Sequence, residues 1–183
     1  MTGVQTCALP IYASLVAGEN AVTVFERAPV AGGAFRYAGK APLFQEVVAA
    51  ENSFDRYVAR IVAACVHNGV AFRHGVDVAH APDVLAGFDR IVIATGARYR
   101  FGLGPLPALL LDRGAGRWPG LRRLFSWPPF RDWFYHRARR STGEDFRRLA
   151  RPGQKVTVIG DAARAGKSQP AIASAFEAAL LGG

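Results

Sequence analysis

The sequence lacks a long apolar run and has few cysteines, and both absences restrict what the chain can be. No stretch of about 18 uncharged apolar residues occurs, which argues against a membrane-spanning helix. No basic segment leads into an apolar one, so we expect no secretory signal. The two cysteines, Cys7 and Cys65, do not suggest a disulfide framework. We therefore expect a cytoplasmic protein with reduced thiols.

Lysine is scarce as well, and the basic charge of the chain comes from arginine in one stretch. The net charge is +9, carried by 20 Arg and 3 Lys against 14 acids. Eleven of the arginines lie in residues 112–151 beside four acids, so this stretch alone carries +7. The rest of the chain is nearly neutral. We expect the charge to act locally, and we expect no nucleic-acid partner.

The first eleven residues read MTGVQTCALPI, which resembles the translation of a common short-read sequencing adapter. Residues 1–11 are therefore set aside from the expected fold, as a fusion scar would be. The alternative is a genuine N-terminal arm. With the adapter interpretation, the natural gene begins further upstream and Cys7 has no role.

Helical and strand patterns alternate from Tyr12 onward, which predicts an α/β fold with a mostly parallel sheet covered on both faces. Apolar spacing, glycines and prolines predict helices at residues 12–18, 43–68, 120–126, 130–140, 143–150 and 168–181. Short apolar, β-branched runs predict strands at residues 21–25, 70–73, 76–78, 91–94 and 155–159. We expect one domain made of residues 12–100 and 152–183, interrupted by a basic, aromatic insertion at 101–151.

Glu26 ends a buried strand just before a turn. Dinucleotide-binding folds place an acid there because a carboxylate accepts both hydroxyls of the adenosine ribose. Such an acid follows a Gly-rich phosphate loop by about 20 residues. Counting back from Glu26 reaches the adapter-like residues, so we expect the loop and its strand to be encoded upstream. The alternative is an ordinary exposed Glu at a strand end.

Four segments, in order, resemble the pyridine-nucleotide-disulfide-reductase-like flavoproteins. The resemblance is greatest to the branch of dienoyl-CoA reductases, trimethylamine dehydrogenases and the glutamate synthase small subunit. The segments are VTVFERAPVAGGAFRYAGKAP (22–42), GVDV (75–78), FDRIVIATGAR (88–98) and VTVIGDAARAGKSQPAIASAFEAA (156–179). This resemblance implies a Rossmann-like, three-layer FAD-binding fold, truncated at the N-terminus and carrying a helical insertion.

The resemblance also implies which residues contact FAD. Glu26 would hold the adenosine ribose, the backbone of Val78 would contact the adenine, and Asp161 would hold the ribityl hydroxyls. Asp161 also suits a helix N-cap. Glycines without a Cβ let the backbone approach a cofactor, although an ordinary turn explains them too. The full candidate set is Glu26, Arg27, Gly32, Gly33, Val78, Thr95, Gly96, Gly160 and Asp161.

Other chemistries are weakly supported. The segment GDAARAGKS (160–168) resembles a P-loop but has five residues between its glycines where that loop requires four, so we do not expect ATP binding. Cys65 lies at a core position of a helix and has no CxxC partner, which favours packing. We expect no metal site and no catalytic triad, since the flavin would carry the chemistry. No metal-ligand spacing connects His67, His74, His80 and His136.

The insertion occupies the place where fuller family members carry a second, NAD(P)H-binding domain. It is too short for a βαβ unit and has no Gly-x-Gly-x-x-Gly, so direct NAD(P)H use by this chain is doubtful. Residues 121–140 mix Trp, Phe and Tyr with Arg. That composition fits an interfacial membrane helix, a protein interface, a nucleic-acid surface or a helical cap over the FAD domain.

The predicted function is flavin-mediated electron or hydride transfer, within a larger bacterial oxidoreductase that supplies a redox partner domain or subunit. The high content of Ala, Arg, Gly and Pro indicates a GC-rich genome. The alternative is a non-catalytic binding module. It would dock a partner or a membrane surface, such as that of the inner membrane, through residues 121–140.

Overall fold

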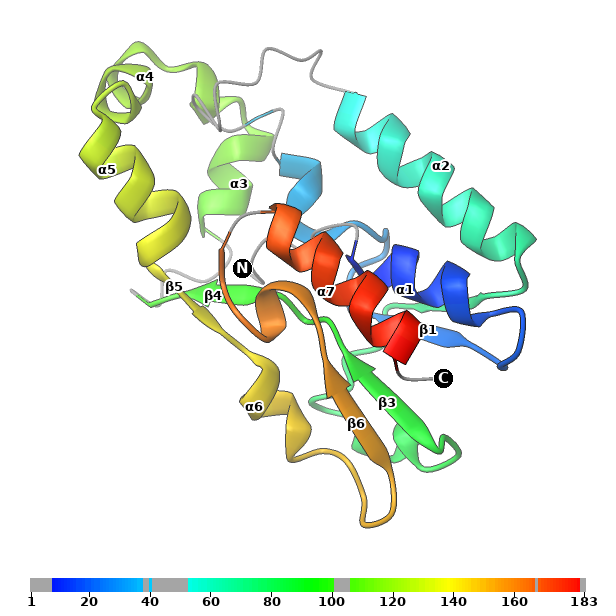
Figure 1. Cartoon of the computed structure of the whole chain (residues 1–183). Helices are drawn as coiled ribbons and strands as arrows, with labels where there is room; N and C mark the ends of the chain where they lie inside the picture. Colours follow the sequence, from blue (N-terminus) through cyan, green and yellow to red (C-terminus); the bar gives the residue numbers. More distant parts are fainter. Residues whose placement is uncertain (1–7, 38–39, 41–52, 101–105, 167, 182–183) are drawn as a thin grey trace.

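The computed structural model describes residues 8–37, 40, 53–100, 106–166 and 168–181. Helices and short strands follow one another along the chain (Figure 1). The helices are α1 (Ala8–Val16), α2 (Ser53–His67), α3 (Leu106–Asp112), α4 (Pro119–Phe125), α5 (Pro128–Asp132), α6 (Gly143–Arg147) and α7 (Ser168–Leu181). The strands are β1 (Thr23–Glu26), β2 (Ala71–His74), β3 (Arg90–Ile93), β4 (Ala97–Tyr99), β5 (Arg139–Ser141) and β6 (Lys155–Val158). No helix of this described part is long and apolar enough to cross a membrane.

The strands form three two-stranded sheets. β1 pairs with β2 in parallel, β3 pairs with β6 in parallel, and β4 pairs with β5 in an antiparallel ladder. The predicted α/β class is therefore confirmed at this coarse level. The expectation of a single, mostly parallel sheet is wrong for the described residues, because no strand there joins the β1–β2 pair to the β3–β6 pair.

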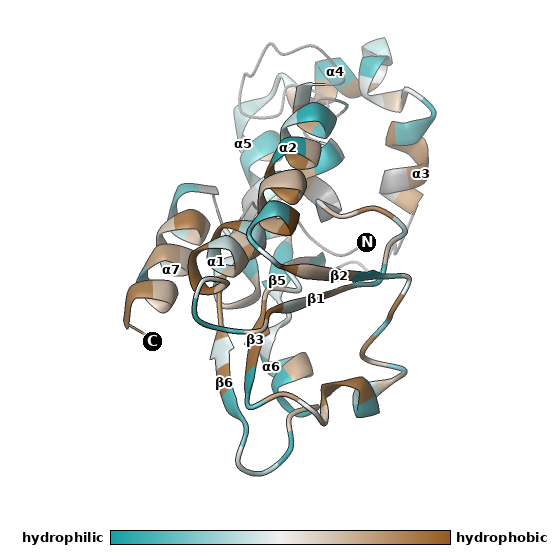
Figure 2. Ribbon diagram, turned by 90° about the vertical axis from the view of Figure 1, so that its right-hand side faces the viewer, coloured by the Kyte–Doolittle hydropathy of each residue, from teal (hydrophilic) through white to brown (hydrophobic). Residues whose placement is uncertain are grey.

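Helix α1 holds the two parallel pairs together. On one side Ala8 and Tyr12 pack with Ile159, which follows β6, and with α7. On the other side Ala13 packs with Val24 of β1 and with α2. The sequence ALPIYASLV carries no charged residue, so α1 is suited to burial on both sides. Figure 2 shows the apolar residues of α7, β1 and β3 gathered around α1.

Several element boundaries differ from prediction. α1 begins at Ala8, inside the adapter-like segment, and ends at Val16. α2 begins at Ser53, and positions 43–52 of the longer helix expected there lie outside the described residues. The strand expected at 76–78 is wrong. There the chain turns, and the carboxylate of Asp77 accepts the backbone N–H of Ala79 at 3.0 Å.

The helix expected at 130–140 is wrong only over its last three residues, 138–140. α5 ends at Asp132, a π-helical turn covers Trp133–Arg137, and the chain then extends into β5. Phe134, in the π-helical turn, contacts Tyr99 of β4, with the two rings tilted and their centroids 4.9 Å apart. Phe125 of α4 lies at the centre of the same cluster, with further aromatic contacts to Phe130, Phe134 and Tyr135. The insertion thus has a small aromatic core joined to β4.

Candidate functional site

The candidate residues lie just after the parallel strands end. Glu26 ends β1, Thr95 and Gly96 follow β3, and Gly160 and Asp161 follow β6. In α/β folds with parallel strands, ligands bind at these carboxyl ends. Positive φ values, which the missing side chain permits, occur at all four candidate glycines, Gly32, Gly33, Gly96 and Gly160.

Asp161 is buried against an arginine from the insertion. Its side chain is 1% exposed, and its Oδ2 lies 3.2 Å from Nη1 of Arg139, whose side chain is 2% exposed. The other oxygen, Oδ1, accepts the backbone N–H of Gly166 at 3.3 Å. Arg139 also donates from Nη2 to the carbonyl of Gly166 at 2.6 Å. Both carboxylate oxygens are therefore engaged, and Asp161 and Arg139 together position the loop after β6.

Two opposing effects act on the carboxyl of Asp161. Burial away from water disfavours its charged form and raises its pKa, whereas Arg139 and the N–H of Gly166 lower it. Burial is the larger effect, so the pKa of Asp161 is raised to about 6. The Nε–H of Arg139 is buried and has no hydrogen-bond partner among the described residues. The carboxylate of Asp161 is therefore in a buried ion pair with Arg139 and is not accessible to solvent.

Thr142 connects the end of β3 to the insertion. Its hydroxyl donates to the carbonyl of Gly96 at 2.7 Å and lies 2.8 Å from the hydroxyl of Thr95. Thr142 is fully buried, and the next residue, Gly143, lies against β6. A Cβ at Gly143 would lie 2.5 Å from Cγ1 of Val158, so only glycine allows this close approach. Thr142 and Gly143 thus contact both the turn after β3 and the end of β6.

Glu26 has a more open setting. Its Oε1 accepts the backbone N–H of Ala28 at 2.9 Å, and its other oxygen has no partner within the described part of the chain. Glu26 lines a small, partly open pocket. Apolar side chains form most of this pocket, whose other lining residues are Leu9, Pro10, Val24, Ala31, Gly32, Phe35, Val58, Ile61 and Phe72.

Gly32 lies at the wall of this pocket with φ +108°. A Cβ there would lie 2.7 Å from Cγ1 of Val58 on α2. Gly32 is therefore needed for packing against α2, whether or not a ligand approaches it. The nearby Arg27 lies 3.9 Å from Asp77, and that contact connects the loop after β1 to the turn after β2.

A second and larger hollow separates β1 from β3. Val78 and Thr95 both line it, so the structure brings these two candidates to one hollow. Glu26 and Gly32 belong to the other pocket, while Asp161 and Gly160 are covered by the insertion. Leu9 of α1 and Val24 of β1 line both pockets.

These residues fit a flavin nucleotide only in part. Glu26 offers a carboxylate oxygen beside a pocket at a strand end, which suits a ribose hydroxyl. Asp161 is 1% exposed and is covered by Arg139, so a ligand cannot reach its carboxylate in this arrangement. For the ribityl hydroxyls to reach Asp161, the Arg139 side chain would have to move.

The sequence reasoning missed Arg139 and Thr142. Arg139 was assigned to the end of the helix expected at 130–140, and Thr142 to the break before the helix expected at 143–150. A usable signal was present, since a β-branched Thr before a Gly favours an extended segment.

Other reactive groups do not form a site. The described residues contain no group of His, Cys, Asp and Glu able to hold a metal ion. Cys65 is fully buried, its thiol donates to the carbonyl of Pro10 at 3.2 Å, and burial raises its pKa, as a packing residue requires. Lys167 of the P-loop-like segment lies outside the described residues. Comparisons with protein-family models, with curated proteins and with solved structures found no match to this chain.

Proposed function

We propose that this chain is part of an FAD-dependent oxidoreductase, with a Rossmann-like domain that binds the adenosine half of FAD at the ends of β1 and β2. The strand arrangement carries the proposal. One strand placed between β1 and β3 would create the order β2–β1–new strand–β3–β6. That order is the one in which dinucleotide-binding folds place their first five strands, numbered 3-2-1-4-5 along the chain.

Particular residues would bind the cofactor. Glu26 would accept ribose hydroxyls from a position already oriented by the N–H of Ala28. The backbone of Val78, in the turn that follows β2, would contact the adenine. Thr95 and Gly96, fastened by Thr142, would form the turn that faces the flavin. When bound, FAD would supply the electron or hydride transfer, and the residues named here would bind and orient it.

A flavin titration tests this proposal. The chain should be compared with a version extended at its N-terminus by the upstream codons of its gene. We expect the extended protein to be yellow, with stoichiometric FAD. The 183-residue chain should bind FAD poorly, because the pyrophosphate needs the N–H groups of a Gly-rich turn. Stoichiometric FAD on this shorter chain would contradict the expected role of that turn. An extended protein without flavin would contradict the proposed function.

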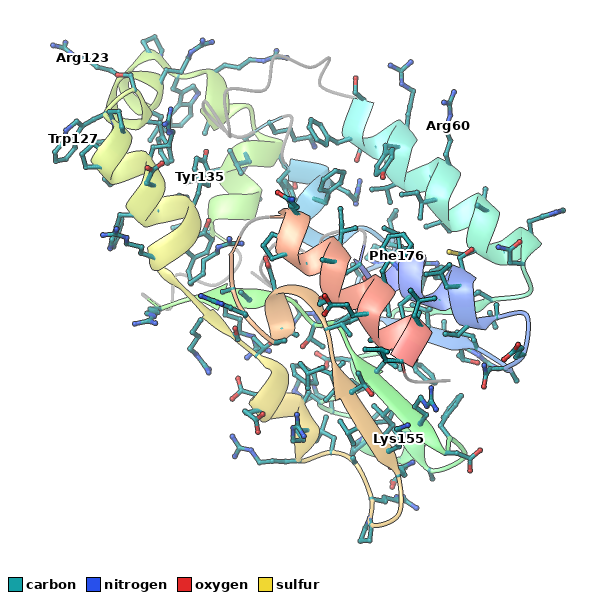
Figure 3. All side chains as sticks on the ribbon, in the orientation of Figure 1. Arg60, Arg123, Trp127, Tyr135, Lys155 and Phe176 are labelled. Carbon is teal, nitrogen blue, oxygen red and sulfur yellow. The ribbon has the colours of Figure 1, made fainter. Side chains whose placement is uncertain are left out.

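A second candidate function, docking of an anionic membrane surface, is favoured by the outer face of α4 and α5. Trp118, Trp127 and Trp133 are 53%, 60% and 44% exposed, and Arg122 and Arg123 are exposed beside them. Figure 3 shows Arg123 and Trp127 at the outer edge of these helices. Tryptophan with arginine is the composition of interfacial anchors.

Vesicle sedimentation tests the second candidate. Phosphatidylserine-containing vesicles should bind the chain in low salt, and phosphatidylcholine vesicles should not. Replacing Trp118 and Trp127 by alanine should weaken binding by about tenfold, since each change removes a large apolar anchor. Equal binding to both vesicle types, or no loss in the double variant, would contradict this function.

A further inference from the structure

The hollow between β1 and β3 has the walls of a strand-binding groove. Residues of β1 form one wall and residues of β3 form the other. Its remaining surface is apolar, with Leu9 of α1 on one side and Leu85, Phe88, Phe146 and Leu149 elsewhere. In Figure 2 the two strand pairs diverge beneath α1, as strands of a twisted sheet do.

Both walls expose backbone hydrogen-bonding groups. The carbonyls of Val22 and Glu26 accept N–H groups on the β2 side, at 2.9 and 3.1 Å. In a parallel ladder alternate residues bond to opposite edges, so Thr23 and Phe25 direct their N–H and C=O groups to the groove. No strand of the described chain lies against this edge of β1.

The edge of β3 is arranged in the same way. The carbonyls of Asp89 and Ile93 accept N–H groups on the β6 side, at 2.9 and 3.0 Å. Arg90 and Val92 therefore direct their backbone groups to the groove, where the described residues again supply no strand. The unpaired edges of β1 and β3 therefore both present backbone N–H and C=O groups to this hollow, and a single strand placed there could form hydrogen bonds with both edges.

We infer that this groove binds an extended apolar peptide as a single strand, parallel to β1 and to β3 and hydrogen-bonded to both. A strand in this place is buried on both faces, so its sequence should be a continuous β-branched run. A second folded copy of this chain does not fit, because a strand already in a sheet has only one free edge. The occupant must come without a neighbouring strand of its own. This groove is the gap that the proposed function fills with one further strand, so the inference rests on that strand order, but flavin is not needed to test it.

Short synthetic peptides test the inference with the chain as it is. The probe is a labelled peptide with a central Val-Ile-Val-Ile-Val run and lysines at both ends for solubility, and binding is measured by fluorescence anisotropy. We expect saturable binding that raises the thermal midpoint of the chain, because the peptide binds only the folded state. The control peptide has the same apolar residues separated by glycine and serine, so it lacks the continuous β-branched run. It should bind at least tenfold more weakly. No saturable binding by the first peptide, or equal binding by both peptides, would overturn the inference.

An N-methyl scan of the peptide distinguishes a strand between two edges from a strand added to one edge. Between β1 and β3, consecutive peptide N–H groups bond alternately to the two walls. N-methylation at any of the five central positions should therefore weaken binding by about fivefold or more, since each removes one ladder hydrogen bond. Loss at alternate positions only would show pairing to a single edge and would contradict the inference.

A matched pair of chain variants locates the bound peptide. Leu149 lines the groove, whereas Val84 is exposed outside it. Leu149→Lys should weaken peptide binding by tenfold or more, and Val84→Lys should leave it unchanged. Far-UV circular dichroism must match the parent chain for both variants. Equal affinities of two folded variants would place the peptide elsewhere and overturn the inference.

Discussion

Glu26 and Asp161 occupy equivalent places, each where a parallel strand ends, yet their surroundings differ. Glu26 has one oxygen held by a backbone N–H and one without a protein partner in the described residues, beside an apolar pocket. Asp161 is buried, and Arg139 and Gly166 engage both of its oxygens. An acidic residue at the end of a strand is accessible to a ligand only where the neighbouring segment does not cover its side chain. Here the insertion covers one acid and not the other.

The largest expected effect comes from removing Arg139. Arg139→Met leaves Asp161 buried without its cation, which should lower the free energy of unfolding at neutral pH by about 3–5 kcal/mol. Urea denaturation measures the change. Arg148→Met is the control, because that side chain is 78% exposed in its ion pair with Asp145 and should cost less than about 1 kcal/mol. Adding Asp161→Asn to Arg139→Met should restore part of the loss, and equal losses in the two single variants would contradict a buried pair.

The buried carboxyl of Asp161 should make the stability of the chain depend on pH. Asp161 has a pKa of about 6 in the folded chain against its usual 3.8. Between these values the folded state binds more protons, so this group's contribution to stability falls as pH rises through the window. The loss should approach about 2–3 kcal/mol by pH 7. Urea denaturation at about pH 4 and pH 7 should show this slope in the parent chain and a smaller one in Asp161→Asn.

The affinity of the N-terminally extended protein for FAD also allows Glu26 and Asp161 to be compared. Glu26→Ala and Asp161→Ala should each weaken FAD binding by tenfold or more, since a hydrogen bond to a charged acceptor is worth about 1.5–3 kcal/mol. The loss for Asp161→Ala assumes that Arg139 moves aside when FAD binds. Lys167→Ala should have little effect. Isothermal titration with FAD and with ATP measures all three, and a dominant effect of Lys167 on ATP binding would favour a P-loop.

The smallest expected effect concerns the loop beside Glu26. Gly32→Ala brings a Cβ within 2.7 Å of Val58 at a φ of +108°, which should cost about 1–3 kcal/mol. Gly69→Ala is matched to it, because Gly69 also has positive φ but no atom lies within 4 Å of the place that its Cβ would take. Thermal denaturation should place Gly69→Ala closer to the parent chain. The opposite ranking would show that α2 does not press on this loop.

The elements that were predicted well are those whose conformation follows from the propensities of their own residues. β1, β3 and β6 are short runs rich in β-branched or aromatic residues, and α7 is rich in alanine. Short polar strands were not predicted. β5 reads Arg-Arg-Ser and is extended because it pairs with β4, which lies about 40 residues earlier in the chain. Local propensity contains no information about such a partner.

The candidate site was predicted in position but not in environment. The pattern placed Glu26, Thr95, Gly96, Gly160 and Asp161 after strands, and the structure has each of them there. That Arg139 would cover Asp161 depends on the packing of the whole insertion. The expected single sheet depended on a partner for β1 and β3 that the described residues do not supply.

Helix α1 has a consequence for how the molecule unfolds. Because Tyr12 belongs to one apolar cluster and Ala13 to the other, a strand pair that separates from α1 exposes one face of the helix on which both clusters depend. The slowest-exchanging amide protons of both pairs should therefore become exposed in one cooperative opening. The aromatic core around Phe125 has no residue in either cluster, so its amides should open independently and sooner. A nine-residue helix thus sets the size of the cooperative folding unit.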